Sequence, residues 1–314
     1  MPAPPNTRIY DAQGVISKGI SVGGHNRITV TDGFDSVSRT RFDGRQGTHA
    51  VNKLGKFVRF TQTCMDPTKA LTLVNEAPSD AADFLTYYVA KDGTSPTAFV
   101  KHTLLRPRYT SLSIRIPESG PATMELAGEC LWLLENGVAA AEFHEVHATT
   151  DEVSQLTVDA DLSNPEIIEE LKTVTLAALT LQHRSSLNIR IDGQVRRDRN
   201  PGFAGPDSII WIPDTVRFDL TTKDGGFSDD GTKTSQQDLL DAAAASLVAT
   251  VGKVNGADDR VFTLFNAKFT EASGEFPFDN YGTFTPNGEC EWMSADGTTF
   301  YTLGGSDPIM TIGT

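Results

Sequence analysis

The sequence has little cysteine, no long apolar run and no excess of basic charge. Only three cysteines occur in 314 residues, Cys64, Cys130 and Cys290, so a disulfide framework is excluded and we interpret them as small core hydrophobes. No apolar run approaches the roughly 20 residues that span a bilayer, so we expect no membrane partner. Residues 1–5, Met-Pro-Ala-Pro-Pro, lack the basic and apolar regions of a signal peptide. We therefore expect a soluble protein made in a cytoplasm.

Catalytic and metal-binding motifs are also scarce. His144-Glu145-Val146-His147 is the best metal candidate, but its spacing differs from His-Glu-x-x-His and no third ligand is identifiable, which favours structural or surface histidines. The sequence contains neither a Gly-rich phosphate-binding signature nor a Gly-x-Ser-x-Gly elbow. We therefore predict no catalytic residue, no metal, no cofactor and no enzymatic activity.

The charge is strongly acidic, because 41 Asp and Glu residues outnumber 27 Lys and Arg residues and give a formal net charge of -14. This balance excludes a general DNA-coating protein, since such proteins gain affinity when Lys and Arg replace the counterions of the phosphates. It is compatible with a surface that must avoid adhering to nucleic acid. The length is about twice the common domain size of roughly 100–150 residues.

What the sequence does contain is an internal repeat. Gly-Glu-Cys-Leu-Trp at residues 128–132 returns 160 residues later as Gly-Glu-Cys-Glu-Trp at residues 288–292, and 11 of 35 positions are identical between residues 103–137 and 263–297. Val58-Arg59-Phe60 and Asp32-Gly33 return more weakly as Val216-Arg217-Phe218 and Asp192-Gly193. The repeat predicts two homologous domains, residues 1–148 and 173–314, joined by a connector at residues 149–172.

The repeated segments alternate apolar and polar residues, which is typical of half-buried strands. In each copy we predict a long hairpin with one dry and one polar face, the first turning at residues 117–120. The predicted core anchors are Cys130, Trp132, Cys290 and Trp292. The predicted polar face carries Glu125, Glu129, Glu271, Glu275, Glu289 and Glu291. A solvated face is a better interpretation of Glu289 and Glu291 than an acid/base pair, because Leu131 occupies the equivalent position of the first copy.

One helix per half is expected to interrupt the strands. The first follows Ser79, with an apolar stripe at i, i+3, i+4, i+7 and i+8 that ends at Val89, and the second begins near Ser235 and buries residues as far as Val251. Between the halves, Asn164-Pro165 predicts the start of a short acidic helix that runs through Lys172.

Clusters of arginine locally reverse the acidic charge. The larger cluster lies on both sides of Asp192-Gly193, which is a strong two-residue turn signal. Either a contact with a neighbouring acidic subunit or a solvated loop explains such a cluster. The candidate subunit contacts are Arg196, Arg197 and Arg199, with Arg190 nearby, and Arg39, Arg41 and Arg45 in the first copy.

With two tandem copies of about 150 residues, long hairpins, a short helix and a polar strand face, the chain resembles the major tail tube proteins of siphoviruses and tailed archaeal viruses. The resemblance implies a mainly β fold of two β-sandwich or barrel-like domains, and hairpins that join those of neighbours into a ring. It further implies a homotrimer that imitates a hexamer, stacked rings, contacts with other tail proteins, passage of double-stranded DNA and a location in the virion tail. The acidic residues of the polar face would then line either bulk water or the lumen.

A second function class remains open at this stage. A two-domain β-sandwich binding module, of the carbohydrate-binding or adhesin-like kind, would also fit a repeated β protein. Sugar binding normally requires an exposed aromatic platform, whereas Trp132, Trp211 and Trp292 are predicted to be buried. Tail-tip, head-closure and capsid-decoration proteins are further alternatives within the structural class.

Overall fold

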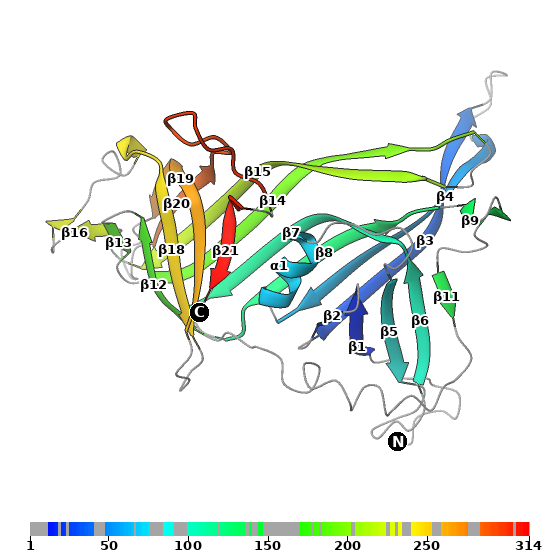
Figure 1. Ribbon diagram of the computed structural model, residues 1–314, viewed down its shortest axis with the longest axis horizontal. Helices are drawn as coiled ribbons and strands as arrows, with labels where there is room; N and C mark the ends of the chain where they lie inside the picture. The colour runs from blue at the N-terminus through cyan, green and yellow to red at the C-terminus, as the bar shows by residue number, and fades with distance from the viewer. Residues whose placement is uncertain are drawn as a thin grey trace.

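The computed structural model describes most of both repeats. The described residues are 12–17, 20–22, 25–40, 48–65, 67–75, 84–90, 99–118, 120–132, 134–135, 138–139, 144–146, 170–176, 179–181, 184–201, 205–223, 227–229, 232–233, 240–252, 259–275, 283–303 and 306–313. Residues 12–146 are called the first half below, and residues 170–313 the second half. The prediction of a mainly β protein is confirmed (Figure 1).

The first half contains eleven strands and one helix among its described residues. They are β1 (Ala12–Ser17), β2 (Ile20–Val22), β3 (His25–Thr40), β4 (Thr48–Cys64), α1 (Pro67–Asn75), β5 (Phe84–Ala90), β6 (Phe99–Leu105), β7 (Pro107–Pro117), β8 (Thr123–Cys130), β9 (Leu134–Glu135), β10 (Val138–Ala139) and β11 (His144–Val146). Helix α1 lies against β7, β8 and β2.

The second half contains ten strands among its described residues. They are β12 (Glu170–Leu176), β13 (Leu179–Leu181), β14 (Arg184–Asp198), β15 (Ser208–Lys223), β16 (Phe227–Asp229), β17 (Thr232–Lys233), β18 (Ala245–Gly252), β19 (Arg260–Glu275), β20 (Thr283–Cys290) and β21 (Met310–Gly313).

The two halves share one antiparallel sheet of 14 strands. Its order is β17-β16-β13-β12-β18-β19-β20-β15-β14-β7-β8-β4-β3, with β21 added beside β19. The halves meet where β7 of the first half pairs with β14 of the second half. A smaller sheet of the first half has the order β11-β6-β5-β1-β2.

The strand pairs of one half recur in the other. In the first half β3 pairs with β4, β4 with β8 and β8 with β7; in the second half β14 pairs with β15, β15 with β20 and β20 with β19. The pairs of β5 with β1 and β6 likewise match those of β18 with β12 and β19. Even the bulges agree, because the register shifts between Tyr109 and Ser111 and again between Phe269 and Glu271. The internal repeat of the sequence therefore extends to strand order and register.

The repeated core residues make matching contacts. Phe60 packs edge-on against Tyr109 with ring centroids 5.7 Å apart, and Phe218 packs edge-on against Phe269 at 5.4 Å. Gly128 lies directly over the ring of Phe60, where a Cβ would collide with the ring and with a backbone carbonyl; Gly288 lies over Phe218 in the same way. This close approach explains why glycine begins the repeated Gly-Glu-Cys motif.

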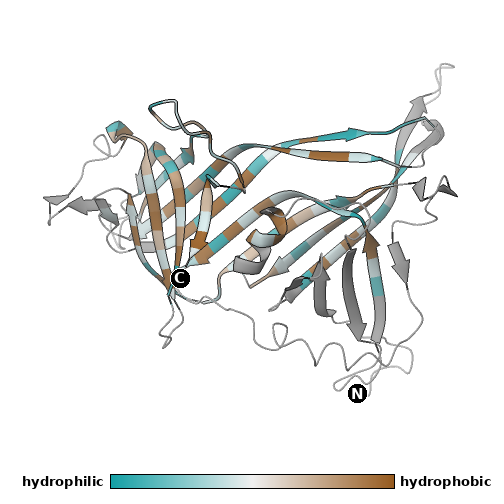
Figure 2. Ribbon diagram, viewed as in Figure 1, coloured by the Kyte–Doolittle hydropathy of each residue, from teal (hydrophilic) through white to brown (hydrophobic). Residues whose placement is uncertain are grey.

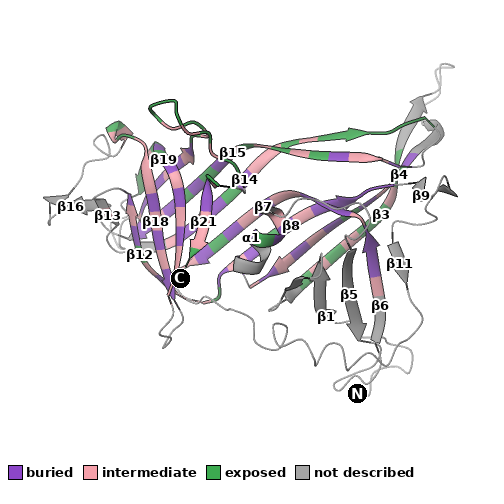
Figure 3. Cartoon of the chain, viewed as in Figure 1, coloured by how far each residue is buried: buried purple, intermediate pink, exposed green. Residues whose placement is uncertain are grey.

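A single apolar core extends through both halves. Brown and teal segments alternate along the strands in Figure 2, and the buried residues follow the apolar ones in Figure 3. In β18, for example, Leu247, Ala249 and Val251 are buried. The hairpin of β14 and β15 leaves this core, and near its tip residues 196–201 are exposed.

The helix predicted after Ser79 is wrong, and of the described residues in the helix predicted near Ser235 only Leu240 and Asp241 are helical. Phe84–Ala90 is strand β5 and Ala245–Gly252 is strand β18. Residues i and i+4 share a face in a strand as well as in a helix, so Leu247 and Val251 satisfied both patterns. The β-branched and aromatic content of residues 84–90 favours strand pairing. The helix of the first half lies earlier, at Pro67–Asn75.

Two further sequence predictions need correction. Lys172 lies in strand β12, so the connector helix does not run through it; residues 149–169 lie outside the described residues. Asp192-Gly193 is not a turn, because β14 continues through it with a bulge. A Cβ on Gly193 would collide with Trp211 and with the backbone of Ile212 and Pro213, so glycine permits the close approach of β15 here.

Candidate assembly interface

The junction of the two halves is the most distinctive site of the molecule. Six residue pairs join β7 to β14, from Pro117 with Ser186 to Leu112 with Ile191. Beyond Ile191, β14 bulges away from the sheet and the hairpin β14–β15 extends toward the end of the first half, where β4 and β9 lie (Figure 1). The junction thus consists of a strand edge and a hairpin tip from one half, placed on the other half.

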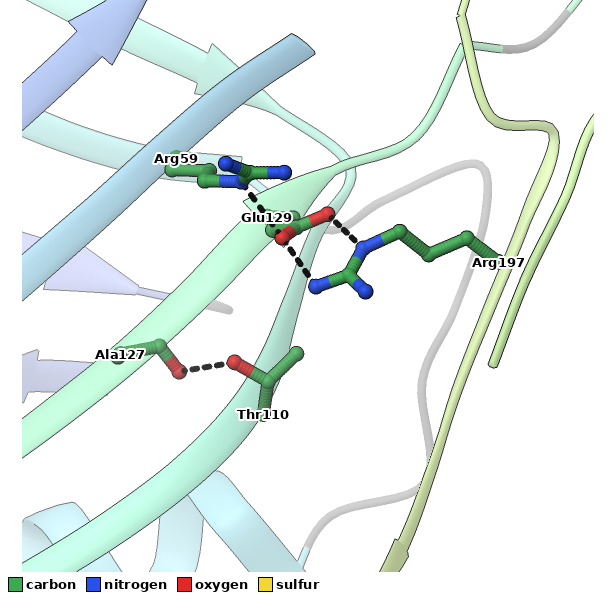
Figure 4. A network of polar contacts seen from close by, with 5 residues as sticks. All are labelled: Arg59, Thr110, Ala127, Glu129 and Arg197. Atoms are coloured by element: carbon green, nitrogen blue, oxygen red, sulfur yellow. Dashed lines mark hydrogen bonds and ion pairs between the residues drawn. The ribbon is translucent and has the colours of Figure 1, made fainter. Parts of the chain in front are cut away.

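Glu129 is the centre of this contact. The carboxylate accepts a hydrogen bond from Arg59 Nε at 2.8 Å, and from Arg197 it accepts two, from Nε at 2.6 Å and from Nη2 at 2.5 Å (Figure 4). Strand β8 supplies Glu129, β4 supplies Arg59 and β14 of the other half supplies Arg197. The side chain of Glu129 is only 6% exposed, whereas those of Arg59 and Arg197 are 47% and 41% exposed, so a buried carboxylate is paired with two partly exposed cations.

The charge state of Glu129 follows from these partners. Burial alone would raise the pKa of the carboxyl group, but the hydrogen bonds and charges of Arg197 and Arg59 outweigh it and the pKa lies below its ordinary value. Glu129 reciprocally raises the pKa of Arg197. The bidentate geometry from Arg197 adds directional specificity to the attraction. Glu129 is therefore an ionised clamp for the incoming hairpin.

Trp132 makes the second contact with the hairpin. Its backbone N–H donates a hydrogen bond to the carbonyl of Pro206 at 2.6 Å, and its side chain is buried. Lys56 Nζ lies 5.8 Å from the centre of the indole ring, within range of a cation–π attraction. A backbone hydrogen bond at the strand end positions this residue, since the N–H of Leu131 donates to the carbonyl of Arg106.

The second half carries the same arrangement, but no hairpin in the described part of the chain covers it. Arg217 Nε lies 3.0 Å from Glu289, as Arg59 does from Glu129, but the Glu289 side chain is 44% exposed. Trp292 is only partly buried and donates from its indole Nε1 to the carbonyl of Asp214 at 2.7 Å. Asn266 matches Arg106, because both have a positive φ, 53° and 51°, and each accepts a hydrogen bond from the residue before the tryptophan.

The predicted core anchors fall in corresponding places of the two halves. Cys130 and Cys290 are buried, and burial raises the pKa of both thiols, that of Cys290 to about 12. Trp132 is buried, whereas Trp292 lies at the edge of the core.

The predicted polar face is divided. Glu125, Glu271, Glu275 and Glu291 are exposed, and Glu289 is intermediate. Glu129, which was predicted to lie on the polar or lumenal face, is instead buried, because the hairpin β14–β15 covers it and Arg197 pairs with its carboxylate. The sequence pattern alone could not reveal this cover, since Arg197 lies 68 residues away from Glu129.

The arginine clusters have several different environments. Arg197 contacts the other half of its own chain through Glu129, and its contact with a neighbouring subunit stays a prediction. Arg196 pairs with Asp198 on the exposed hairpin, and Arg199 is exposed. The side chain of Arg39 and the whole of Arg41 and Arg45 lie outside the described residues.

Sequence reasoning did not identify Arg59 as part of the site. The signal was present in the repeat, since Val58-Arg59-Phe60 and Gly128-Glu129 both return in the second copy. In adjacent antiparallel strands, Arg59 and Glu129 are direct partners, and so are Arg217 and Glu289. A repeated pair of opposite charges in neighbouring strands could have indicated this cross-strand contact.

Among the described residues no group of three or more His, Cys, Asp or Glu side chains could hold a metal ion. His144 begins strand β11, while the side chains of residues 144–146 and all of His147 lie outside the described part of the chain. No helix in the described ranges is long and apolar enough to cross a membrane.

No protein-family model matches the sequence, and no curated protein matches it.

Proposed function

We propose that this chain is a structural virion protein whose copies form trimeric rings with six similar domains, and that stacked rings form the tail tube through which double-stranded DNA passes. The observation that carries the proposal is the junction of β7 with β14. It joins two copies of one repeat edge to edge, so the first half is extended by the second in the way one subunit of a ring extends the next. Closure of such a ring removes the exposed strand edges at its ends.

The charge of the chain supports the conduit part of the proposal. A net charge of -14 disfavours retention of phosphate, which Lys and Arg would otherwise hold. Exposed Glu125, Glu271 and Glu275 continue this charge along β8 and β19. The proposed partners are other copies of the chain, other tail proteins and DNA in transit without sequence-specific contacts. The proposed location is the virion tail, after synthesis in the host cytoplasm.

Electron microscopy of the purified chain, combined with its mass in solution, tests the assembly. We expect three chains per ring, six similar domains around a central pore, and stacks of such rings. Six whole chains per ring would contradict the trimer. Monodisperse monomers at all concentrations would contradict the tube and favour a two-domain binding module.

Charge reversal tests the role of the channel wall once the lumenal residues are located in a ring. Lysine in place of the lumenal acids should slow DNA delivery from virions with intact tails, because a cationic wall holds phosphate. Substitution of the same number of acids on the outer surface is the matched control. Unchanged delivery in the lumenal variant would rule out the electrostatic role without affecting the tube itself.

A further inference from the structure

The junction inside one chain specifies what an equivalent junction between two chains would contain. Strand β14 corresponds to β3, because Ile189 pairs with Phe218 as Val30 pairs with Phe60. Strand β7 corresponds to the end of β19, because Ser113 pairs with Glu125 as Ser273 pairs with Thr285. An equivalent junction would therefore join β3 to the end of β19.

Both of these edges are open within the described part of the chain. Strand β3 is the last strand of the large sheet and pairs only with β4. Residues 272–275 of β19 pair with β20 on one side, whereas the pairs of β19 with β18 and β21 involve residues 260–267. Open edges with unpaired backbone groups are templates for pairing with another chain. Within one chain, β3 and β19 are at separate places in the sheet order, with β20, β15, β14, β7, β8 and β4 between them.

The surface next to the open end of β19 also lacks the cover that its counterpart has. Glu289 is 44% exposed where Glu129 is 6% exposed, and the difference arises because Arg197 and its hairpin cover only Glu129. Beside Trp292, Met293 and Phe300 are 46% and 61% exposed and form a bridge with each other. Exposed large apolar side chains next to an uncovered anion match the surface that a hairpin would cover.

We propose that β3 of one copy pairs antiparallel with residues Ala272–Glu275 of β19 in a second copy, so that the hairpin β3–β4 lies on the second half of its neighbour. The register inside the chain places Arg190 opposite Ser113 and Asn188 opposite Arg115. Between chains it places Thr31 opposite Ser273 and Thr29 opposite Glu275. The partner is a second copy of this chain, and the assembly is head to tail.

This inference rests on the ring assembly of the proposed function and specifies which strands would join its chains. It does not depend on the passage of DNA. A head-to-tail contact uses two different surfaces of each chain, so it produces a closed ring when the rotation closes and an open filament when it does not. With three chains, each ring would contain three junctions within chains and three between chains. Glu289 would receive the arriving hairpin as Glu129 receives β14–β15.

Disulfide trapping between separately labelled chains tests the register. Thr29, Thr31, Ser273 and Glu275 are all exposed, and single cysteines at these positions give four mixtures. Thr31→Cys with Ser273→Cys, and Thr29→Cys with Glu275→Cys, place directly opposed side chains within disulfide range. The other two mixtures are offset by two residues and are the matched controls. The native thiols do not interfere, because Cys64, Cys130 and Cys290 are buried.

On a non-reducing gel, the yield of disulfide-linked two-chain product should be roughly tenfold higher in the two matched mixtures than in the offset mixtures. Glu289→Gln in the Ser273→Cys chain should lower that yield several-fold, whereas Glu125→Gln should leave it unchanged. A chain that carries both Thr31→Cys and Ser273→Cys should form covalent trimers as its largest closed product.

The possible results distinguish a failure of the proposed interface from a failure of the proposed tail-tube function. Equal yields in matched and offset mixtures overturn the proposed register, and no cross-link in a protein that forms rings overturns the proposed strand pairing while the ring stands. Monomers without cross-links overturn both. Matched cross-links in a protein that never stacks into tubes support the interface and contradict the tail tube.

Discussion

The two copies of the repeated Gly-Glu-Cys motif differ in their surroundings more than in their residues. Glu129 and Glu289 occupy the same position beside an arginine of the neighbouring strand. Within the described ranges a hairpin covers Glu129 but not Glu289, and Glu129 is therefore 6% exposed whereas Glu289 is 44% exposed. The repeat therefore determines the local contact, whereas the position of each half within the sheet determines the burial and charge environment of this glutamate.

Other differences between the halves lie away from this motif. In the first half β6 and β7 are separate strands on either side of Arg106, whereas β19 passes through Asn266 as one strand. Helix α1 follows β4, whereas the short strands β16 and β17 follow β15. The shared hairpins and their bulges are therefore the constant part of the repeat, and the segments between them have changed.

The largest expected effects test the equivalence of the two cores. Phe60→Ala and Phe218→Ala each remove a nearly fully buried ring, and each should lower the free energy of unfolding by about 3–5 kcal/mol. Because the partner rings and glycines correspond, the two losses should agree to within about 1 kcal/mol. Urea unfolding of the single variants measures both. A large loss at one site with little at the other would break the equivalence.

The tryptophans should behave less equally. Trp132→Ala should cost about 3–5 kcal/mol, because the side chain is buried and the hairpin contacts the same residue. Trp292→Ala should cost about 1–3 kcal/mol in the isolated chain, since part of the ring remains in water and its hydrogen bond to Asp214 contributes about 1 kcal/mol. Thermal unfolding at low protein concentration provides the comparison. Equal losses would show that the difference in burial has no energetic consequence.

Removal of the carboxylates of Glu129 and Glu289 should lower the free energy of unfolding by different amounts. Glu129→Gln leaves Arg59 and Arg197 without their anion and should cost about 1–3 kcal/mol, a range that allows for the partial exposure of both arginines. Glu289→Gln removes an exposed pair and should cost about 0–1 kcal/mol. Glu125→Gln, on the exposed face of β8, is the control and should change stability by less than about 0.5 kcal/mol. A neutral Glu129→Gln variant would argue against the clamp.

The contribution of Glu129 to stability should also depend on pH. Its pKa is lower in the folded chain than its ordinary value, so the carboxylate stabilises the fold at pH values above the pKa of the unfolded chain, about 4.3. This contribution is lost as the pH falls through the folded pKa. The stability difference between the original chain and Glu129→Gln should be constant above about pH 5.5 and shrink below about pH 5. A stability difference that grows on acidification would show that protonation of Glu129 stabilises the fold, which contradicts the lowered pKa.

Sequence patterns predicted the strands of the repeat better than its helices. The alternation of apolar and polar residues in the repeated segments predicted β7, the predicted turn at residues 117–120 precedes β8, and Gly120 adopts a positive φ of 94° there. The stripes that ended at Val89 and Val251 were wrong because a spacing of four residues fits both periods. Asp192-Gly193 was wrong because glycine also permits a bulge within a long strand.

The acidic balance, the mainly β class and the two copies of one pattern follow from the amino-acid sequence, because composition and short-range periodicity are local properties. The burial of Glu129, its pairing with Arg197 and the union of β7 with β14 in one sheet depend on the tertiary structure. These features depend on which strand edges meet across the chain. The same Gly-Glu-Cys residues accept either environment, so local sequence cannot distinguish the covered copy from the uncovered one.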